Sequence, residues 1–225
     1  MARKSMATVR RAELAQAAYL ALSRHGLKGT TLSSVAAITG MSKASALHYF
    51  ASKDALLEAA LRRAQAIVAT EALALLRQSR TPWERVYAIL EANLSPTSFT
   101  PTLAHAWVAL CSEVPHNAKY QRIQKAIYRR NWSNLHTALR MAAPPAQAMR
   151  LTQTLISLID GLWLRCSLQP DGISRAEARQ QFDLILDLAF PAEAERLAAK
   201  ARMEDIAGIL FPTGGSGRRG PPPHD

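Results

Sequence analysis

The sequence predicts an all-α protein with a small N-terminal three-helix unit and a larger C-terminal helical domain. Alanine and leucine are abundant, while aromatic residues make up only 6% of the 225 residues, a composition that favours helices. Apolar residues recur at three- and four-residue spacing, as on one face of an amphipathic helix. Runs of β-branched residues bounded by turns, which would indicate strands, are missing from the sequence.

The N-terminal unit begins with an amphipathic helix. Its apolar face is formed by Leu14, Ala17, Ala18, Ala21 and Leu22. We expect this helix to end at His25-Gly26, because glycine tolerates the left-handed conformation of a helix C-cap.

Two short helices joined by a tight break are predicted next. Thr31 stands where an N-cap belongs, ahead of apolar residues at the i, i+3 and i+4 positions. Thr39-Gly40-Met41-Ser42 interrupts the pattern, with Gly40 suited to the turn and Ser42 to capping a helix over 43–50. Ser52 then caps a long helix that runs to about Gln78.

Prolines mark the boundaries of the later helices. Thr81-Pro82 is an N-cap followed by proline at the first helical position. With the later prolines, the pattern predicts helices near 82–94, 101–113, 117–142, 145–168, 174–190 and 191–209. The expected domains are residues 1–53, residues 54–211 and a tail, 212–225, whose glycine- and proline-rich composition predicts disorder.

The charge distribution points to a nucleic-acid partner of the N-terminal unit. The formal net charge is +11 and the isoelectric point is near 10.3. Residues 1–53 contain eight lysines and arginines against a single acidic residue, Glu13, so the basic character is concentrated there.

Other features favour a cytoplasmic protein without a cofactor. Cys111 and Cys166 lack CxxC spacing and read as reduced thiols. Charged residues interrupt the N-terminal apolar pattern, so no signal peptide is expected. The most apolar stretch, 155–164, contains Asp160 and is too short to span a bilayer. We also expect no metal, because the histidines lack ligand spacing.

The two short helices have the spacing of a helix-turn-helix, in which the second helix enters the major groove of double-stranded DNA. Its exposed side chains would reach base edges, and the helix N-termini would meet phosphates. Tyr49 and Lys53 would contact the sugar-phosphate backbone. The predicted DNA-binding residues are Thr31, Ser33, Ser42, Lys43, Ala44, Ser45, Leu47, His48, Tyr49 and Lys53. Because one head reads half a site, we expect a homodimer on a palindromic operator.

The same residues resemble the DNA-binding signature of the TetR family of repressors. The resemblance lies in Gly40-Met41-Ser42-Lys43-Ala44-Ser45-Ala46-Leu47-His48-Tyr49-Phe50, followed by Ser52-Lys53-Asp54-Ala55-Leu56-Leu57. It covers roughly the first quarter of the chain. Ala44 stands where glycine is common, and Ala46-Leu47 replaces the frequent Leu-Tyr, so operator preference does not carry over.

A narrower resemblance extends thinly over residues 85–190. It lies in Ile159-Asp160-Gly161-Leu162-Trp163-Leu164-Arg165 and, upstream, in Arg122, Gln124, Arg130 and Ser133-Asn134-Leu135. These residues are similar to the C-terminal domain of the BetI type, the choline-responsive repressors of glycine-betaine synthesis. The resemblance implies dimerisation through helices 145–168 and 174–190, with the inducer held among the other helices. The apolar residues expected at that interface are Leu155, Leu158, Leu162, Phe182, Ile185 and Leu186.

A quaternary ammonium inducer requires aromatic faces and a carboxylate. The candidate ligand-binding residues are Tyr87, Trp107, Cys111, Trp132, Asp160 and Trp163, with Glu113 as an alternative carboxylate. Cys111 stands where the family tends to show a further aromatic residue. Packing is the favoured explanation for each of these residues, since tryptophans at helical spacing are more often core residues than parts of an aromatic cage.

We therefore expect a repressor without catalytic activity that a small molecule, choline or a relative, releases from DNA. One alternative is a TetR-type repressor for an unrelated apolar or cationic ligand. A second is a small helical enzyme with Cys111 as nucleophile, although no base is evident beside it. A third is a non-specific basic DNA protein or a peripheral membrane binder, neither of which needs so long a helical domain.

Overall fold

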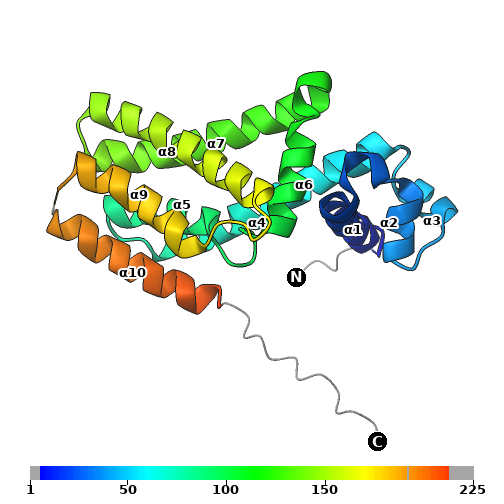
Figure 1. The fold of residues 1–225 in the computed structure, drawn as a ribbon, viewed down its shortest axis with the longest axis horizontal. Helices are drawn as coiled ribbons and strands as arrows, with labels where there is room; N and C mark the ends of the chain where they lie inside the picture. The colour runs from blue at the N-terminus through cyan, green and yellow to red at the C-terminus, as the bar shows by residue number, and fades with distance from the viewer. Residues whose placement is uncertain (1–5, 192, 213–225) are drawn as a thin grey trace, which may run out of the picture.

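A computed structural model describes residues 6–191 and 193–212, and within these ranges the chain is helical without strands (Figure 1). The helices are α1 (Met6–Gly29), α2 (Leu32–Ile38), α3 (Lys43–Tyr49), α4 (Lys53–Gln78), α5 (Pro82–Asn93), α6 (Pro101–Cys111), α7 (Ala118–Ala142), α8 (Pro145–Leu168), α9 (Arg175–Ala189) and α10 (Ala194–Leu210), with a 3₁₀ turn at Val114–His116. The all-α prediction is confirmed. The predicted disordered tail lies outside the described residues, apart from Pro212.

The predicted caps of the N-terminal unit form as expected. Thr31 and Ser42 accept hydrogen bonds from the backbone N–H of the residue three positions on, each at 3.0 Å, and Ser52 does the same at 3.2 Å. Gly26 and Gly40 have φ angles of 60° and 67°. These positive φ angles produce a kink in α1 at Gly26 and the turn between α2 and α3, because only glycine adopts them without strain. The prediction that the first helix ends at His25-Gly26 is therefore wrong, since α1 continues past the kink to Gly29.

The first hydrophobic core joins α1, α2 and α3 to the beginning of α4. Leu14, Phe50 and Leu61 are among its buried members, and Leu110 and Ile127 bring α6 and α7 into the same cluster. The predicted boundary at 53/54 coincides with the start of α4, but this core continues along α4 to Ala64. The head is therefore packed onto the rest of the chain through α4 and α6.

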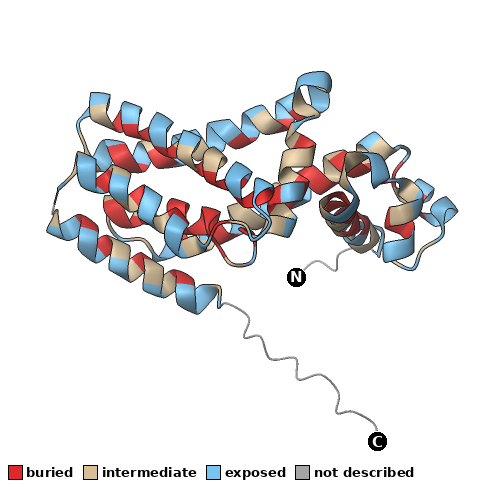
Figure 2. Ribbon diagram, in the orientation of Figure 1, coloured by how far each residue is buried: buried red, intermediate tan, exposed pale blue. Residues whose placement is uncertain are grey.

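The second core fills the C-terminal domain around α5, which is buried along almost its whole length (Figure 2). Trp83 packs edge-to-face against Phe190 with ring centroids 4.8 Å apart. Its indole Nε1 donates a 2.9 Å hydrogen bond to Glu193, which leads into α10. The last predicted helix thus forms and packs against α5.

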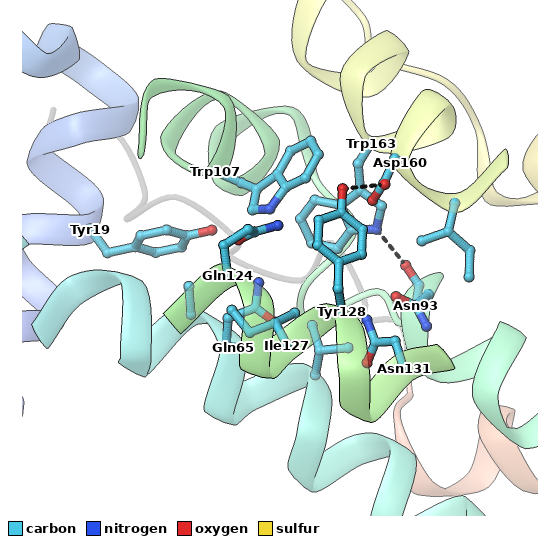
Figure 3. Close-up of a pocket in the computed structure, with 13 residues that line it drawn as sticks. Tyr19, Gln65, Asn93, Trp107, Gln124, Ile127, Tyr128, Asn131, Asp160 and Trp163 are labelled. Carbon is cyan, nitrogen blue, oxygen red and sulfur yellow. Dashed lines mark hydrogen bonds between the residues drawn. The ribbon is translucent and has the colours of Figure 1, made fainter. Parts of the chain in front are cut away.

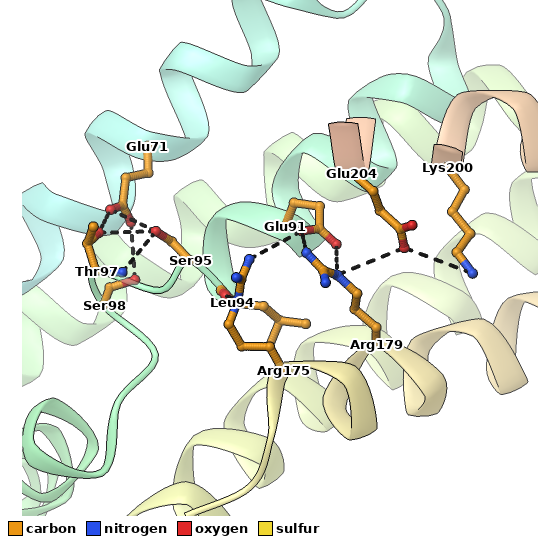
Figure 4. Close-up of polar contacts among 10 residues, drawn as sticks. All are labelled: Glu71, Glu91, Leu94, Ser95, Thr97, Ser98, Arg175, Arg179, Lys200 and Glu204. Carbon is orange, nitrogen blue, oxygen red and sulfur yellow. Dashed lines mark hydrogen bonds and ion pairs between the residues drawn. The ribbon is translucent and has the colours of Figure 1, made fainter. Parts of the chain in front are cut away.

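Two buried carboxylates hold this domain together (Figure 4). Glu71 of α4 accepts hydrogen bonds from the hydroxyls of Ser95 and Ser98 at 3.0 and 3.1 Å, and a third from Thr97. Glu91 of α5 accepts two hydrogen bonds from Arg179 of α9, at 2.7 and 2.5 Å. The first set fixes the loop after α5 on α4, and the second joins α5 to α9.

The prediction that Leu155, Leu162, Phe182 and Leu186 form an exposed interface is wrong. Each is at most 2% exposed within a single chain, because these residues face the chain's own core. Leu158 and Ile185 are partly buried against the same core. Besides Met149 on α8, the large apolar residues that α8 and α9 expose form one pair at i, i+4 spacing on each helix: Leu164 and Leu168, and Leu184 and Leu188.

Among the described helices, none is long and apolar enough to cross a membrane. The described residues also contain no group of three or more His, Cys, Asp or Glu side chains arranged to hold a metal ion.

Candidate functional site

The surface of α3 separates cleanly into an exposed face and a buried anchor. Ala46 and Phe50 are buried in the head core at 0% and 2% exposure. The side chains on the other face are exposed and belong to Lys43, Ala44, Ser45, Leu47 and His48. This is the geometry that a recognition helix needs, since only exposed side chains reach base edges.

The residues flanking α3 are held by contacts that connect it to α1. Arg11 donates a hydrogen bond to the carbonyl of Tyr49, and its guanidinium lies 4.5 Å from the centroid of the Phe50 ring. Lys53 Nζ donates a 2.6 Å hydrogen bond to the carbonyl of Leu27. Arg11, which sequence reasoning missed, and Lys53 therefore fix the orientation of the reading helix as well as adding positive charge beside it.

Three predicted phosphate contacts lie at the starts of α2 and α3. Thr31, Ser33 and Ser42 are all exposed. Thr31 and Ser42 use their hydroxyl oxygens to cap their own helices, leaving the helix N-termini, with their unpaired N–H groups, at the surface.

A second site is a small cavity of about 40 Å³ enclosed by helices from both parts of the chain (Figure 3). Its walls come from α1, α4, α5, α6, α7 and α8. The lining side chains belong to Tyr19, Ala64, Gln65, Val68, Asn93, Trp107, Gln124, Ile127, Tyr128, Asn131, Ile159, Asp160 and Trp163.

The aromatic wall of this cavity is built around Trp163. The ring of Trp163 contacts those of Trp107 and Phe99 edge-to-face, with centroids 5.8 and 5.7 Å apart. Its Nε1 donates a 3.2 Å hydrogen bond to the carbonyl of Asn93 at the end of α5. These contacts fix the indole faces before any ligand arrives.

Asp160 supplies the carboxylate of the cavity. Tyr128 donates a hydrogen bond to its Oδ2 at 2.7 Å. Burial raises the pKa of Asp160 above its ordinary value, and the hydrogen bond from Tyr128 opposes that shift. Burial also raises the pKa of Tyr128, to about 12, so its hydroxyl remains a donor at neutral pH. Gln124 adds a buried Oε1 that has no hydrogen-bond partner among the described residues.

Three of the six predicted ligand residues, Trp107, Asp160 and Trp163, meet in this cavity. Tyr87 does not line it: the side chain is 3% exposed, between α5 and α10, and its hydroxyl accepts a 2.9 Å hydrogen bond from Arg196. Trp132 is also outside, because it is 36% exposed on α7 and stacks on His136.

Cys111 is likewise absent from the cavity lining. Burial raises the pKa of its thiol to about 12. The thiol therefore stays protonated near neutral pH, and a protonated thiol is a poor nucleophile.

No local sequence pattern indicates that the remaining cavity residues share a site. Tyr19, Asn93 and Tyr128 lie on three different helices, far apart in the chain. Only the packing of the head against the C-terminal domain brings them together, as in the 2.8 Å hydrogen bond from the Tyr19 hydroxyl to the carbonyl of Leu103.

Comparison with known proteins identifies the family of both parts of the chain. Residues 14–60 match the N-terminal domain of bacterial regulatory proteins of the tetR family, and residues 82–191 match the C-terminal domain of BetI-type transcriptional repressors. The HTH-type transcriptional regulator BetI of Burkholderia thailandensis is 37% identical over 169 residues, which cover 75% of this chain and 87% of that protein. BetI 2 of Chromohalobacter salexigens is 34% identical over 190 residues, covering 83% and 91%. This chain belongs to the TetR family, with a C-terminal domain of the BetI type.

Solved TetR-family structures share the fold. A regulator from Haloarcula marismortui superposes with a TM-score of 0.72 at 23% identity, covering 80% of this chain and 98% of that chain. A regulator from Saccharomonospora viridis, solved in complex with choline, gives 0.69 at 22% identity, covering 80% and 96%. Like its TetR-family relatives, the chain is a transcriptional regulator and not an enzyme, which removes the Cys111 alternative.

Proposed function

We propose that this TetR-family regulator is a homodimeric repressor that choline, or a related quaternary ammonium compound, releases from a palindromic operator. The observation that carries the proposal is the position of Asp160 in an aromatic cavity. Trp107, Tyr128 and Trp163 provide ring faces, and no lysine or arginine lines the cavity. A carboxylate and ring faces both attract a cation that offers no N–H donor.

The small volume of the cavity supports a mechanism for induction. A space of about 40 Å³ holds a few water molecules, so choline must displace side chains or helices to enter. The wall includes Gln65 and Val68 of α4, and the same helix begins at Lys53 beside the recognition helix. A ligand that favours one position of α4 would then favour one spacing of the two reading heads.

Exposed residues support the DNA-binding half of the proposal. Lys43 and His48, exposed on α3, would contact bases, and the half-buried Tyr49 and Lys53 at the end of α3 and the start of α4 would contact the sugar-phosphate backbone. For the dimer, the exposed leucines of α8 and α9 offer the apolar surface. Two heads would then meet half-sites about 34–36 Å apart.

Isothermal titration calorimetry with choline, betaine aldehyde and glycine betaine tests the inducer. We expect choline to bind with a Kd below about 1 mM, equivalent to about 4 kcal/mol. Asp160→Asn and Trp107→Ala should each weaken binding by about ten-fold, whereas Trp132→Ala, outside the cavity, should leave it unchanged. If none of the three compounds binds the wild-type protein, the inducer is an unrelated apolar or cationic molecule. Equal binding by all three variants would place the site elsewhere.

A further inference from the structure

A larger groove lies next to the aromatic cavity, between α4, α5 and α7. It has a volume of about 550 Å³, within the range of small-molecule sites. Val68, Asn93 and Asn131 line both spaces, so the groove and the cavity are neighbours separated by these shared side chains. The charged side chains of the two spaces nevertheless have opposite signs, because Asp160 lines the cavity and arginines line the groove.

Three arginines from three different helices line the groove: Arg77 of α4, Arg85 of α5 and Arg130 of α7. Among the described residues none of the three lies within 4.0 Å of a carboxylate, and no acidic residue lines the groove. By contrast, Arg179 and Arg202 in the same domain are paired with buried glutamates.

The pKa of Arg130 also indicates that this arginine has no carboxylate partner. Burial lowers it, and no carboxylate counteracts the shift. Although Arg130 as a whole is exposed, its guanidinium has no counter-charge within 4.0 Å among the described residues, and an anion that approaches it would stabilise its charge.

Apart from three asparagines, Asn93, Asn131 and Asn134, the remainder of the groove is apolar. Leu73 is 49% exposed there, and Ile89 forms part of the buried wall. Val68, Ala72 and Leu76 continue the apolar surface along α4. Ligands that suit such a surface carry a hydrocarbon portion.

We propose that this groove is a second ligand site, which binds an amphipathic anion: a carboxylate or phosphate headgroup with an apolar tail. The headgroup accepts hydrogen bonds from Arg85 and Arg130, whose planar guanidinium groups match a carboxylate or phosphate in two-point contacts. The tail lies along the aliphatic side chains of α4. The site is independent of the proposed choline cavity, because Asp160 and the tryptophans take no part in it.

Calorimetric titration of the full chain with octanoate tests the site, with octylammonium as the charge-reversed probe and acetate as the headgroup without a tail. We expect octanoate to bind at least about ten-fold more tightly than either of the other two. Arg85→Gln and Arg130→Gln should each weaken octanoate binding by about ten-fold. Arg140→Gln is the matched control, since Arg140 is an exposed arginine of α7 that lies outside the groove.

Two outcomes would overturn the proposal. One is that octylammonium or acetate binds as tightly as octanoate, and the other is that Arg130→Gln and Arg140→Gln bind octanoate equally. Asp160→Asn should bind octanoate like the wild type, and choline is titrated separately against the same variants. Failure of the anion site is therefore distinguishable from failure of the choline proposal.

Discussion

The helix caps of the reading head and the bonds of the ligand cavity differ in how far apart in the chain their bonded partners lie. The hydroxyls of Thr31, Ser42 and Ser52 each cap a residue only three positions away. In the C-terminal domain, Tyr128 and Asp160 are 32 residues apart, and Trp163 and Asn93 are 70 apart. Local bonds leave a pattern that is readable in the sequence, whereas long-range bonds do not. The contacts of the C-terminal domain should therefore depend more on the assembled tertiary structure than the helix caps of the head do.

The largest effect on operator affinity is expected from separating the dimer, because the C-terminal domains then no longer hold two reading heads together. Leu188→Glu places a charge on a side chain that is 73% exposed on α9 and should separate the dimer. A monomer presents one reading head, so operator affinity should fall by about a hundred-fold although the head itself is unchanged. Sedimentation measures the oligomeric state, and gel-shift titration measures operator affinity.

The control is Ile209→Glu, which changes a similarly exposed residue of α10 and should remain dimeric. A Leu188→Glu monomer with wild-type affinity would show that the head acts alone.

The next prediction compares an ion pair from each region. Glu91→Gln removes the charge opposite Arg179 in the C-terminal domain, where Glu91 is 3% exposed, and should lower the free energy of unfolding by about 3 kcal/mol. Glu58→Gln breaks the exposed pair with Arg62 on α4 and should cost no more than about 0.5 kcal/mol. Urea denaturation provides both values. Equal losses would contradict the idea that long-range buried pairs hold the C-terminal domain.

The pH dependence of choline binding tests the cavity by itself. The proposed choline site requires an ionised Asp160, and burial raises the pKa of this carboxyl above its ordinary value of 3.8. Affinity should therefore be full above the raised pKa and fall as the pH drops through it, at a higher pH than an exposed aspartate would show, by about ten-fold per pH unit. The weaker binding of Asp160→Asn should be independent of pH over the same range. A pH profile shared by both proteins would assign the titration to another group.

The smallest effect is expected from one basic residue of the head. Lys53→Ala should weaken binding to all DNA sequences about equally and reduce the salt slope by about 1, because a backbone contact carries no sequence information. Lys43→Ala, on the exposed face of α3, should instead change which bases are preferred. Gel-shift titration at several salt concentrations separates the two. An unchanged salt slope for Lys53→Ala would mean that its hydrogen bond to Leu27 is its whole role.

The sequence alone determined the helical class, most of the helix boundaries and the exposed face of α3. Those features follow from interactions within one or two turns: the caps at Ser42 and Ser52, the left-handed Gly40, and apolar residues at three- and four-residue spacing. The same pattern did not distinguish an apolar face that meets a partner from one that meets the chain's own core. Leu155 and Phe182 were assigned to the dimer interface for this reason, although both are buried in the monomer.

Only the tertiary structure decided which aromatic residues share a cavity with Asp160. Trp107 and Trp132 carry the same chemistry, but one lines the cavity and the other stacks on His136 outside it. The sequence likewise did not predict that Arg77, Arg85 and Arg130 line one groove, since the three residues lie on three different helices. The physical reason is that helix–helix packing sets these distances through contacts spread over the whole core, and no local spacing in the chain encodes them.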